Sequence, residues 1–303
     1  MSHADHSTVE SLWISVALSF VALLYLHRWL RVGCFAPGSV KGWHVWSFFV
    51  GLLLLRVGLG SPLSLLDHDL LTAHMVQHLL LMTLAPPLIL LGAPLKLLPL
   101  RPAEGLVELI ARPLRWAPLR QLGRMLFHPA VGWFAAAGAL VVWHIPSIFT
   151  LGLRSQTWHG IEQASFLVTG LFFWWPVVEP SRNNLKWPES SILLYLFLAT
   201  LPCDILSGFL VFCDRVVYPV YLSSRRQLGL TALEDQQCAG ALMWTCVTVI
   251  YLIAGAVFTV RLLSSHLLLP HQSPNRSEEL AIPQFDSRRI TVRHADRHRT
   301  EAV

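Results

Sequence analysis

The sequence predicts an all-α membrane protein built as a bundle of seven transmembrane helices. The chain has 303 residues, of which 54% are hydrophobic and 14% are charged, whereas an ordinary soluble domain carries about 25% charged residues. It also contains seven separate apolar runs, each close to the roughly 20 residues that a membrane-spanning helix needs. Both observations argue against a soluble globular enzyme and favour a protein whose solvent is the lipid bilayer.

The seven predicted spans form one membrane domain over residues 11–263, after a short extracytoplasmic N-terminus at residues 1–10. The first span is not interpreted as a cleaved signal peptide, because no Lys or Arg precedes its apolar core while Arg28 and Arg31 follow it. The spans are expected near 11–30, 43–60, 72–91, 129–149, 157–178, 190–213 and 236–263.

The basic residues indicate the orientation of the bundle. With alternating spans, 18 of the 23 Lys and Arg residues fall on one side of the membrane and four on the other. The positive-inside rule makes the first side cytoplasmic, which predicts an outside N-terminus and a cytoplasmic C-terminus. The net charge of +5 is thereby explained by topology, and no nucleic-acid partner is expected.

Two segments outside the spans have their own composition. Residues 92–127 alternate Leu, Pro and Arg, which fits either an amphipathic stretch on the cytoplasmic leaflet or a basic loop. Residues 264–303 become polar and rich in Arg and His, and we expect a disordered, basic cytoplasmic tail. The five cysteines argue against a disulfide framework, although Cys213 and Cys238 are expected near the outer ends of the last two spans.

Ligand-type side chains collect in the predicted outer parts of the spans. His74 and His78 are four residues apart, so both imidazoles face one side of the third span, about 6 Å apart along its axis. His144 lies near the outer end of the fourth span, and His159 and Glu162 lie one turn apart near the start of the fifth. Such residues are costly within a bilayer and are therefore functional candidates.

Several histidines at one depth on different helices are what a metal or a haem requires. A structural hydrogen bond explains a single buried histidine well, but it explains the whole set poorly. Copper accepts imidazole in both oxidation states, and a thioether two turns into the seventh span, at Met243, would favour the reduced ion. Zinc also fits these ligands.

The residues around the histidines form a series of motifs. They are HMVQHLLL at 74–81, APPL at 85–88, LGAP at 91–94, WHIP at 143–146, FWWPV at 173–177, YPVY at 218–221 and GALMW at 240–244. In this order the motifs resemble the CtaG family of bacterial cytochrome c oxidase assembly factors, the polytopic seven-span kind. The resemblance covers residues 11–263 and leaves the tail out.

The resemblance implies a protein of the bacterial inner membrane that helps to mature a haem-copper oxidase and takes part in supplying copper. It implies His74, His78, His144 and His159 as metal ligands, with Asp235 and Met243 as weaker candidates. Cytochrome c oxidase subunits are the expected partners, together with a periplasmic copper chaperone. The family usually has His-x-x-Glu-His in the fifth span, and Gln163 stands at the last position here; either that histidine is not essential or this site is altered.

The sequence therefore predicts a non-enzymatic chaperone of the respiratory chain that holds copper in an outer-leaflet histidine cluster. No nucleophile with its base, no phosphate loop and no nucleotide motif is found. The alternatives are a haem b protein for electron transfer or sensing, with axial ligands such as His78 and His144, and a copper or proton transporter that uses Asp204. Oxidase assembly without any bound metal is a further alternative.

Overall fold

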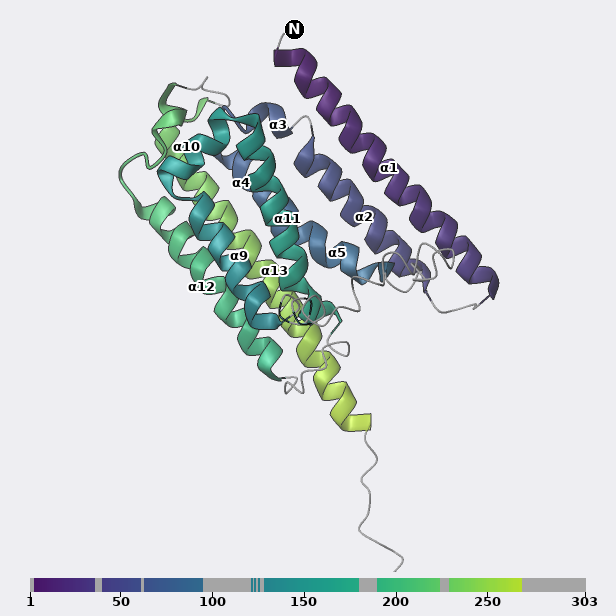
Figure 1. The fold of residues 1–303 in the computed structure, drawn as a ribbon. Coiled ribbons are helices and arrows are strands. Elements are labelled where there is room, and N and C mark those ends of the chain that lie inside the picture. The colour runs from purple at the N-terminus through teal and green to yellow at the C-terminus, as the bar shows by residue number, and fades with distance from the viewer. Residues whose placement is uncertain are drawn as a thin grey trace, which may run out of the picture. The chain divides into compact units, whose positions relative to one another are not determined.

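The computed structural model describes residues 3–35, 40–60, 63–94, 128–179, 190–223 and 229–268, with residues 121, 123 and 125. These residues form helices and no strand (Figure 1), which confirms the predicted all-α class for the described part of the chain. The helices are α1 (His3–Phe35), α2 (Gly42–Leu59), α3 (Leu63–Leu66), α4 (Leu71–Leu79), η1 (Leu80–Leu84), α5 (Ala85–Leu91), α9 (Pro129–Trp143), α10 (Pro146–Arg154), α11 (Gln156–Val178), α12 (Ser190–Phe212), η3 (Pro219–Ser223) and α13 (Ala232–Leu268).

Six stretches of helix in the described residues are long and apolar enough to cross a membrane, and a bent pair brings the number to seven. The six lie at Leu12–Arg31, Gly42–Leu59, Leu71–Leu91, Gln156–Val178, Ser190–Phe212 and Ala232–Ser264. They coincide closely with six of the predicted spans. The structure contains no membrane, so the orientation of the termini stays a prediction.

The fourth predicted span, near 129–149, is not a straight helix. It consists of α9 and α10, which meet at an angle of 80°. Pro146 opens α10, and a proline disfavours the helical conformation in the residue before it. Ile145 accordingly has an extended ψ of 123°. The bend turns α10 away from the axis of α9.

The third span changes its winding at its centre. Leu71–Leu91 runs as α4, then five residues of π-helix in η1, then α5. Pro86 and Pro87 lack the N–H groups that would bond the carbonyls of Met82 and Thr83, four residues earlier. A π-helical turn is one way in which a helix accommodates such a break, and these turns are frequent at functional sites.

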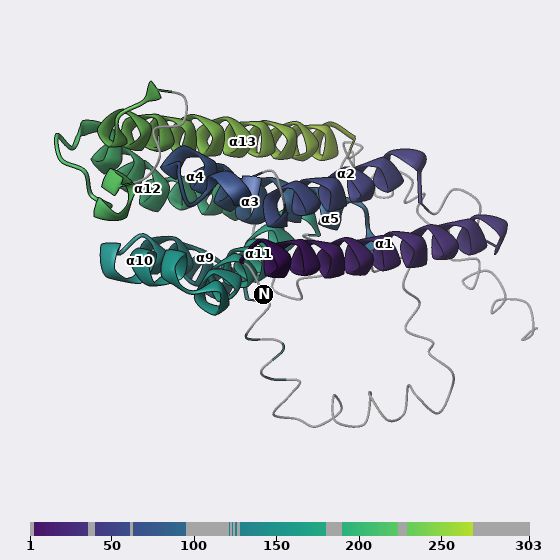
Figure 2. The same cartoon turned by 90° about the horizontal axis from the view of Figure 1, so that it is seen from above.

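The unit formed by Met1–Val260 packs around its central helices. Its main core joins side chains of α4, α9, α11, α12 and α13, whereas α1 packs against α2 at one edge (Figures 1 and 2). Large apolar side chains such as Phe134, Phe197 and Leu252 are more than half exposed. So much exposed apolar surface is typical of a lipid-facing protein. The predicted segment 92–127 and the tail 264–303 fall almost wholly outside the described residues.

Gly170 allows α11 to approach the π-helical turn closely. A Cβ atom at this position would lie 2.7 Å from the carbonyl oxygen of Met82 and 3.0 Å from Cγ of Pro86. Both neighbours belong to the region where the third span changes its winding. The close approach therefore fixes the distance between the two helices that carry most of the ligand-type side chains.

We predict that Gly170→Ala destabilises the protein by about 1–3 kcal/mol, because the added methyl group forces the two helices apart. Thermal unfolding of the purified protein in detergent measures the loss. Gly160→Ala is the matched control on the same helix, since its Cβ would have no neighbour within 4 Å. Equal melting temperatures for both variants would contradict the proposed role of Gly170.

Asp235 binds the beginning of α4. Its carboxylate accepts hydrogen bonds from the backbone N–H of Leu71 at 2.6 Å, from the N–H of Thr72 at 3.2 Å and from the Thr72 hydroxyl at 2.6 Å. The first N–H groups of a helix have no partner within the helix, and a side chain from another element can supply one. Asp235 thus ties α13 to the end of the helix that carries His74 and His78.

Asp235→Ala should lower the free energy of unfolding by about 1–3 kcal/mol, because three donors, one of them buried, lose a charged acceptor. Asp235→Asn keeps one acceptor oxygen and should lose less. Thermal unfolding in detergent distinguishes these outcomes. An Asp235→Ala variant as stable as the wild type would show that the capping contact is dispensable.

Candidate metal centre

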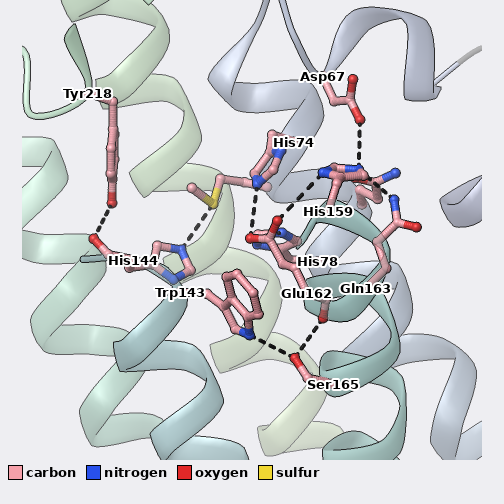
Figure 3. A network of polar contacts seen from close by, with 12 residues as sticks. Asp67, His74, His78, Trp143, His144, His159, Glu162, Gln163, Ser165 and Tyr218 are labelled. Carbon is pink, nitrogen blue, oxygen red and sulfur yellow. Dashed lines mark hydrogen bonds and ion pairs between the residues drawn. The ribbon is translucent and has the colours of Figure 1, made fainter. Parts of the chain in front are cut away.

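A buried carboxylate lies among three imidazoles at one end of the spanning helices (Figure 3). Glu162 of α11 is 1% exposed, and its Oε1 atom lies 3.5 Å from Nε2 of His74 and 3.3 Å from Nε2 of His78. Both histidines come from α4, where their spacing of four residues puts the ring centroids 4.3 Å apart. The helical face predicted for His74 and His78 is therefore confirmed, and Glu162 lies opposite it.

His159 connects Glu162 with a second carboxylate. Its Nδ1 atom lies 3.6 Å from Oε2 of Glu162, one turn further along α11, and its Nε2 atom lies 3.4 Å from Oδ2 of Asp67. Asp67 follows α3 and is 1% exposed. We call Asp67, His74, His78, His159 and Glu162 the imidazole–carboxylate cluster.

The donor atoms of this cluster are close enough to surround a cation. In two overlapping groups of three, the ligand atoms all lie within 4.8 Å of one another; the groups are Asp67, His74 and His159, and His74, His78 and Glu162. His74 belongs to both. Ligands of one ion with bonds of about 2.0–2.2 Å can be separated by no more than roughly 4.4 Å, so small side-chain movements bring either group into range.

Most polar atoms of the cluster have no hydrogen-bond partner. Among the described residues this holds for Oδ1 of Asp67, both ring nitrogens of His74 and His78, Nδ1 of His159 and both carboxylate oxygens of Glu162. Their mutual contacts at 3.3–3.6 Å do not have hydrogen-bond geometry. Buried polar groups are ordinarily hydrogen-bonded, so a concentration of nitrogen and oxygen atoms without hydrogen-bond partners is the pattern expected of a set of metal ligands.

The neighbouring elements leave room for the cluster and hold its parts. A Cβ atom on Gly152 of α10 would lie 2.9 Å from Oε2 of Glu162, so a larger residue there would displace the carboxylate. Tyr221 donates a hydrogen bond to the backbone carbonyl of Asp67 at 2.8 Å. Burial raises the pKa of the Tyr221 phenol well above its ordinary value, which keeps it protonated as a donor.

His144 lies next to the cluster without joining it. Its ring centroid is 5.8 Å from that of His78, and its Nε2 atom faces the sulfur of Met75 at 3.3 Å. The bend after α9 leaves the His144 carbonyl free to accept a hydrogen bond from Tyr218 at 3.0 Å. Of the four predicted histidine ligands, the structure thus brings three together and places the fourth beside them.

The two weaker ligand candidates, Asp235 and Met243, are not members of the imidazole–carboxylate cluster. Asp235 uses its carboxylate to cap α4, as described above. Met243 is buried and lines a small cavity together with His78 and His144. The cysteines Cys203, Cys213, Cys238 and Cys246 are free, so Cys213 and Cys238 form no bridge.

Three neighbours of the histidines had not been predicted as ligands. Asp67 lies in the turn between α3 and α4, outside the predicted spans, and no periodicity of the sequence indicated it. Met75 gave no signal, because its contact with His144 depends on tertiary packing. Gln163, which differs from the family pattern, places its side-chain amide 2.6 Å from Nε2 of His159. Here Gln163 therefore holds a neighbouring imidazole.

Comparison with known proteins yields one family and two relatives. A family model described as cytochrome c oxidase caa3 assembly factor (Caa3_CtaG) matches residues 23–265. The chain is also similar to the uncharacterized protein Mb0105 of Mycobacterium bovis and to the uncharacterized protein MT0111 of Mycobacterium tuberculosis. Each is 22% identical over 207 residues, which are 66% of this chain and 31% of the relative.

The chain therefore spans about a third of the length of these two relatives. No solved structure matches it. The family match includes every residue of the imidazole–carboxylate cluster and confirms the resemblance carried by the sequence motifs. The chain belongs to the cytochrome c oxidase caa3 assembly factor family.

Proposed function

We propose that this protein binds copper in the imidazole–carboxylate cluster and passes it to a cytochrome c oxidase subunit during oxidase assembly. The observation that carries the proposal is the concentration of unpaired nitrogen and oxygen atoms on Glu162, His74 and His78. Family membership supports a role in oxidase assembly. The cluster adds a chemical reason why such a factor contains buried histidines.

The ligand set favours a transition metal. Three imidazoles and two carboxylates are neutral and anionic donors of the kind that copper and zinc accept, whereas magnesium and calcium prefer oxygen alone. A haem-copper oxidase contains copper, which makes copper the metal that an assembly factor would deliver. The transfer is an exchange of ligands and requires no catalytic turnover, so we assign no enzymatic activity.

The position of the cluster fits delivery at one face of the membrane. His74 lies near the start of the span Leu71–Leu91, and His159 and Glu162 lie near the start of Gln156–Val178. With the orientation inferred from the basic residues, this end faces the outside of the bacterial inner membrane. A periplasmic copper chaperone could then load the site, and an oxidase subunit in the same bilayer could receive the ion.

The alternatives receive less support. The cavity lined by both His78 and His144 measures about 40 Å³, far below the roughly 300–1,000 Å³ of an ordinary cofactor pocket, so a haem ligated by these two histidines would require a large rearrangement. A transporter needs ligand groups along the whole path. In the described part of the chain, both groups of three close ligand-type side chains lie at the same end of the bundle.

We predict that the detergent-purified protein, loaded with copper, holds the metal and shows no Soret band. A His74→Ala, His78→Ala double variant should lose at least 90% of the bound copper while remaining folded. Metal analysis and visible spectroscopy of both proteins measure this. His27→Ala is the control, because His27 is exposed on α1.

The same variants test the biological role in cells that lack the wild-type protein. The double variant should fail to restore assembly of the active oxidase, whereas His27→Ala should restore it. A wild-type protein that takes up no copper would overturn the metal assignment. Normal oxidase assembly with the double variant would overturn the role of the cluster.

A further inference from the structure

His144 and Met75 face each other in a way that a hydrogen bond does not explain. Nδ1 of His144 lies 2.7 Å from the carbonyl oxygen of Leu140, which can only accept, so Nδ1 carries the hydrogen. In the neutral ring, Nε2 then has a lone pair and no hydrogen. This lone pair points toward the thioether sulfur of Met75 at 3.3 Å, which is itself a weak acceptor. Two acceptors are thus in contact, and both side chains are buried.

The separation of these two atoms fits two ligands of one metal ion. Metal bonds to imidazole and to sulfur measure about 2.0 and 2.3 Å in zinc sites, so two such ligands can be at most about 4.3 Å apart. At 3.3 Å the angle at the ion would be about 100°, close to tetrahedral. The pair therefore requires no backbone movement to share an ion.

A third donor faces the same region from α4. His78 is 95% buried, and its Nδ1 atom has no hydrogen-bond partner among the described residues. His78 and His144 both line the cavity of about 40 Å³, together with Met82, Met243 and Cys203. That volume exceeds the roughly 10–15 Å³ that a water molecule occupies by the same measure, so there is room for an ion beside the two imidazoles; Met75 approaches His144 without lining this cavity.

We propose that Met75, His144 and His78 form a second metal site, selective for monovalent copper, which shares only His78 with the imidazole–carboxylate cluster. Thioether and thiol ligands prefer the soft Cu(I) ion, whereas carboxylates do not. Its two distinguishing donors, Met75 and His144, do not belong to the imidazole–carboxylate cluster, and the cavity beside His144 is lined by further sulfur-containing side chains. This inference rests on the proposed copper function and names Cu(I) as the oxidation state of the copper that this second site binds.

His78 belongs to both sites. Its Nε2 atom faces Glu162 at 3.3 Å, and its side chain lines the cavity together with that of His144. A copper ion can therefore move from the imidazole–carboxylate cluster to the second site by exchanging ligands around the imidazole of His78. No electron is transferred in this step, and the ion enters and leaves as Cu(I).

The test is a competition titration of the full-length, detergent-purified protein with a chromophoric Cu(I) chelator under reducing conditions. Met75→Leu preserves the side-chain volume and should weaken Cu(I) binding at least tenfold. Met125→Leu is the matched control, because the Met125 side chain is 59% exposed. X-ray absorption of the Cu(I)-loaded wild type should show a sulfur neighbour that is absent from Met75→Leu and present in Met125→Leu.

Only nitrogen and oxygen neighbours in the wild-type spectrum would overturn the second site, and so would unchanged Cu(I) affinity in Met75→Leu. Because the wild-type spectrum is informative by itself, a poorly folded variant leaves the proposal testable. Glu162→Gln separates the two proposals: it changes the imidazole–carboxylate cluster and should leave the sulfur neighbour in place. Normal oxidase assembly with the His74→Ala, His78→Ala variant would overturn the proposed function. The sulfur neighbour in the X-ray absorption spectrum tests the second site independently of that result.

Discussion

The burial of the Glu162 carboxylate among three imidazoles is the constraint on which the rest of the site depends. A carboxylate removed from water is costly unless it is paired, and unpaired ring nitrogens beside it add to that cost. The fold nevertheless keeps these groups 3.3–3.6 Å apart at nearly zero exposure. A bound cation would satisfy all of them at once. We therefore regard the cluster as a ligand set that the surrounding helices hold in position.

Several local features of the helices help to hold the imidazole–carboxylate cluster in position. Pro86 and Pro87 accompany a π-helical turn in the third span, and Gly170 lets α11 approach that turn. Pro146 bends the fourth span by 80° and so places His144 beside the cluster. Asp235 fixes the beginning of α4 from α13. The prolines and Gly170 cost helix stability locally, whereas Asp235 caps a helix; together they allow contacts between helices that regular spans could not make.

The sequence predicted those features that follow from local periodicity. Hydropathy located six spans closely, and helical spacing put His74 beside His78 and Glu162 one turn from His159. The sequence did not predict the features that depend on contacts between distant parts of the chain. The angle of 80° between α9 and α10 could not be predicted from Pro146 alone, the capping contact of Asp235 joins α13 to a distant part of the chain, and Met75 was not singled out because nothing local links it to His144. Asp67 lies just outside a span, where a carboxylate needs no special explanation.

The most direct test of copper binding by the imidazole–carboxylate cluster is the position of copper in a structure determined from copper-loaded protein. Diffraction data collected at the copper absorption edge give an anomalous signal that locates the ion without reference to the protein coordinates. Our account places a peak within bonding distance of His74, His78 and Glu162. Fully loaded crystals with no peak there, and copper bound only at distant histidines such as His44, would contradict it.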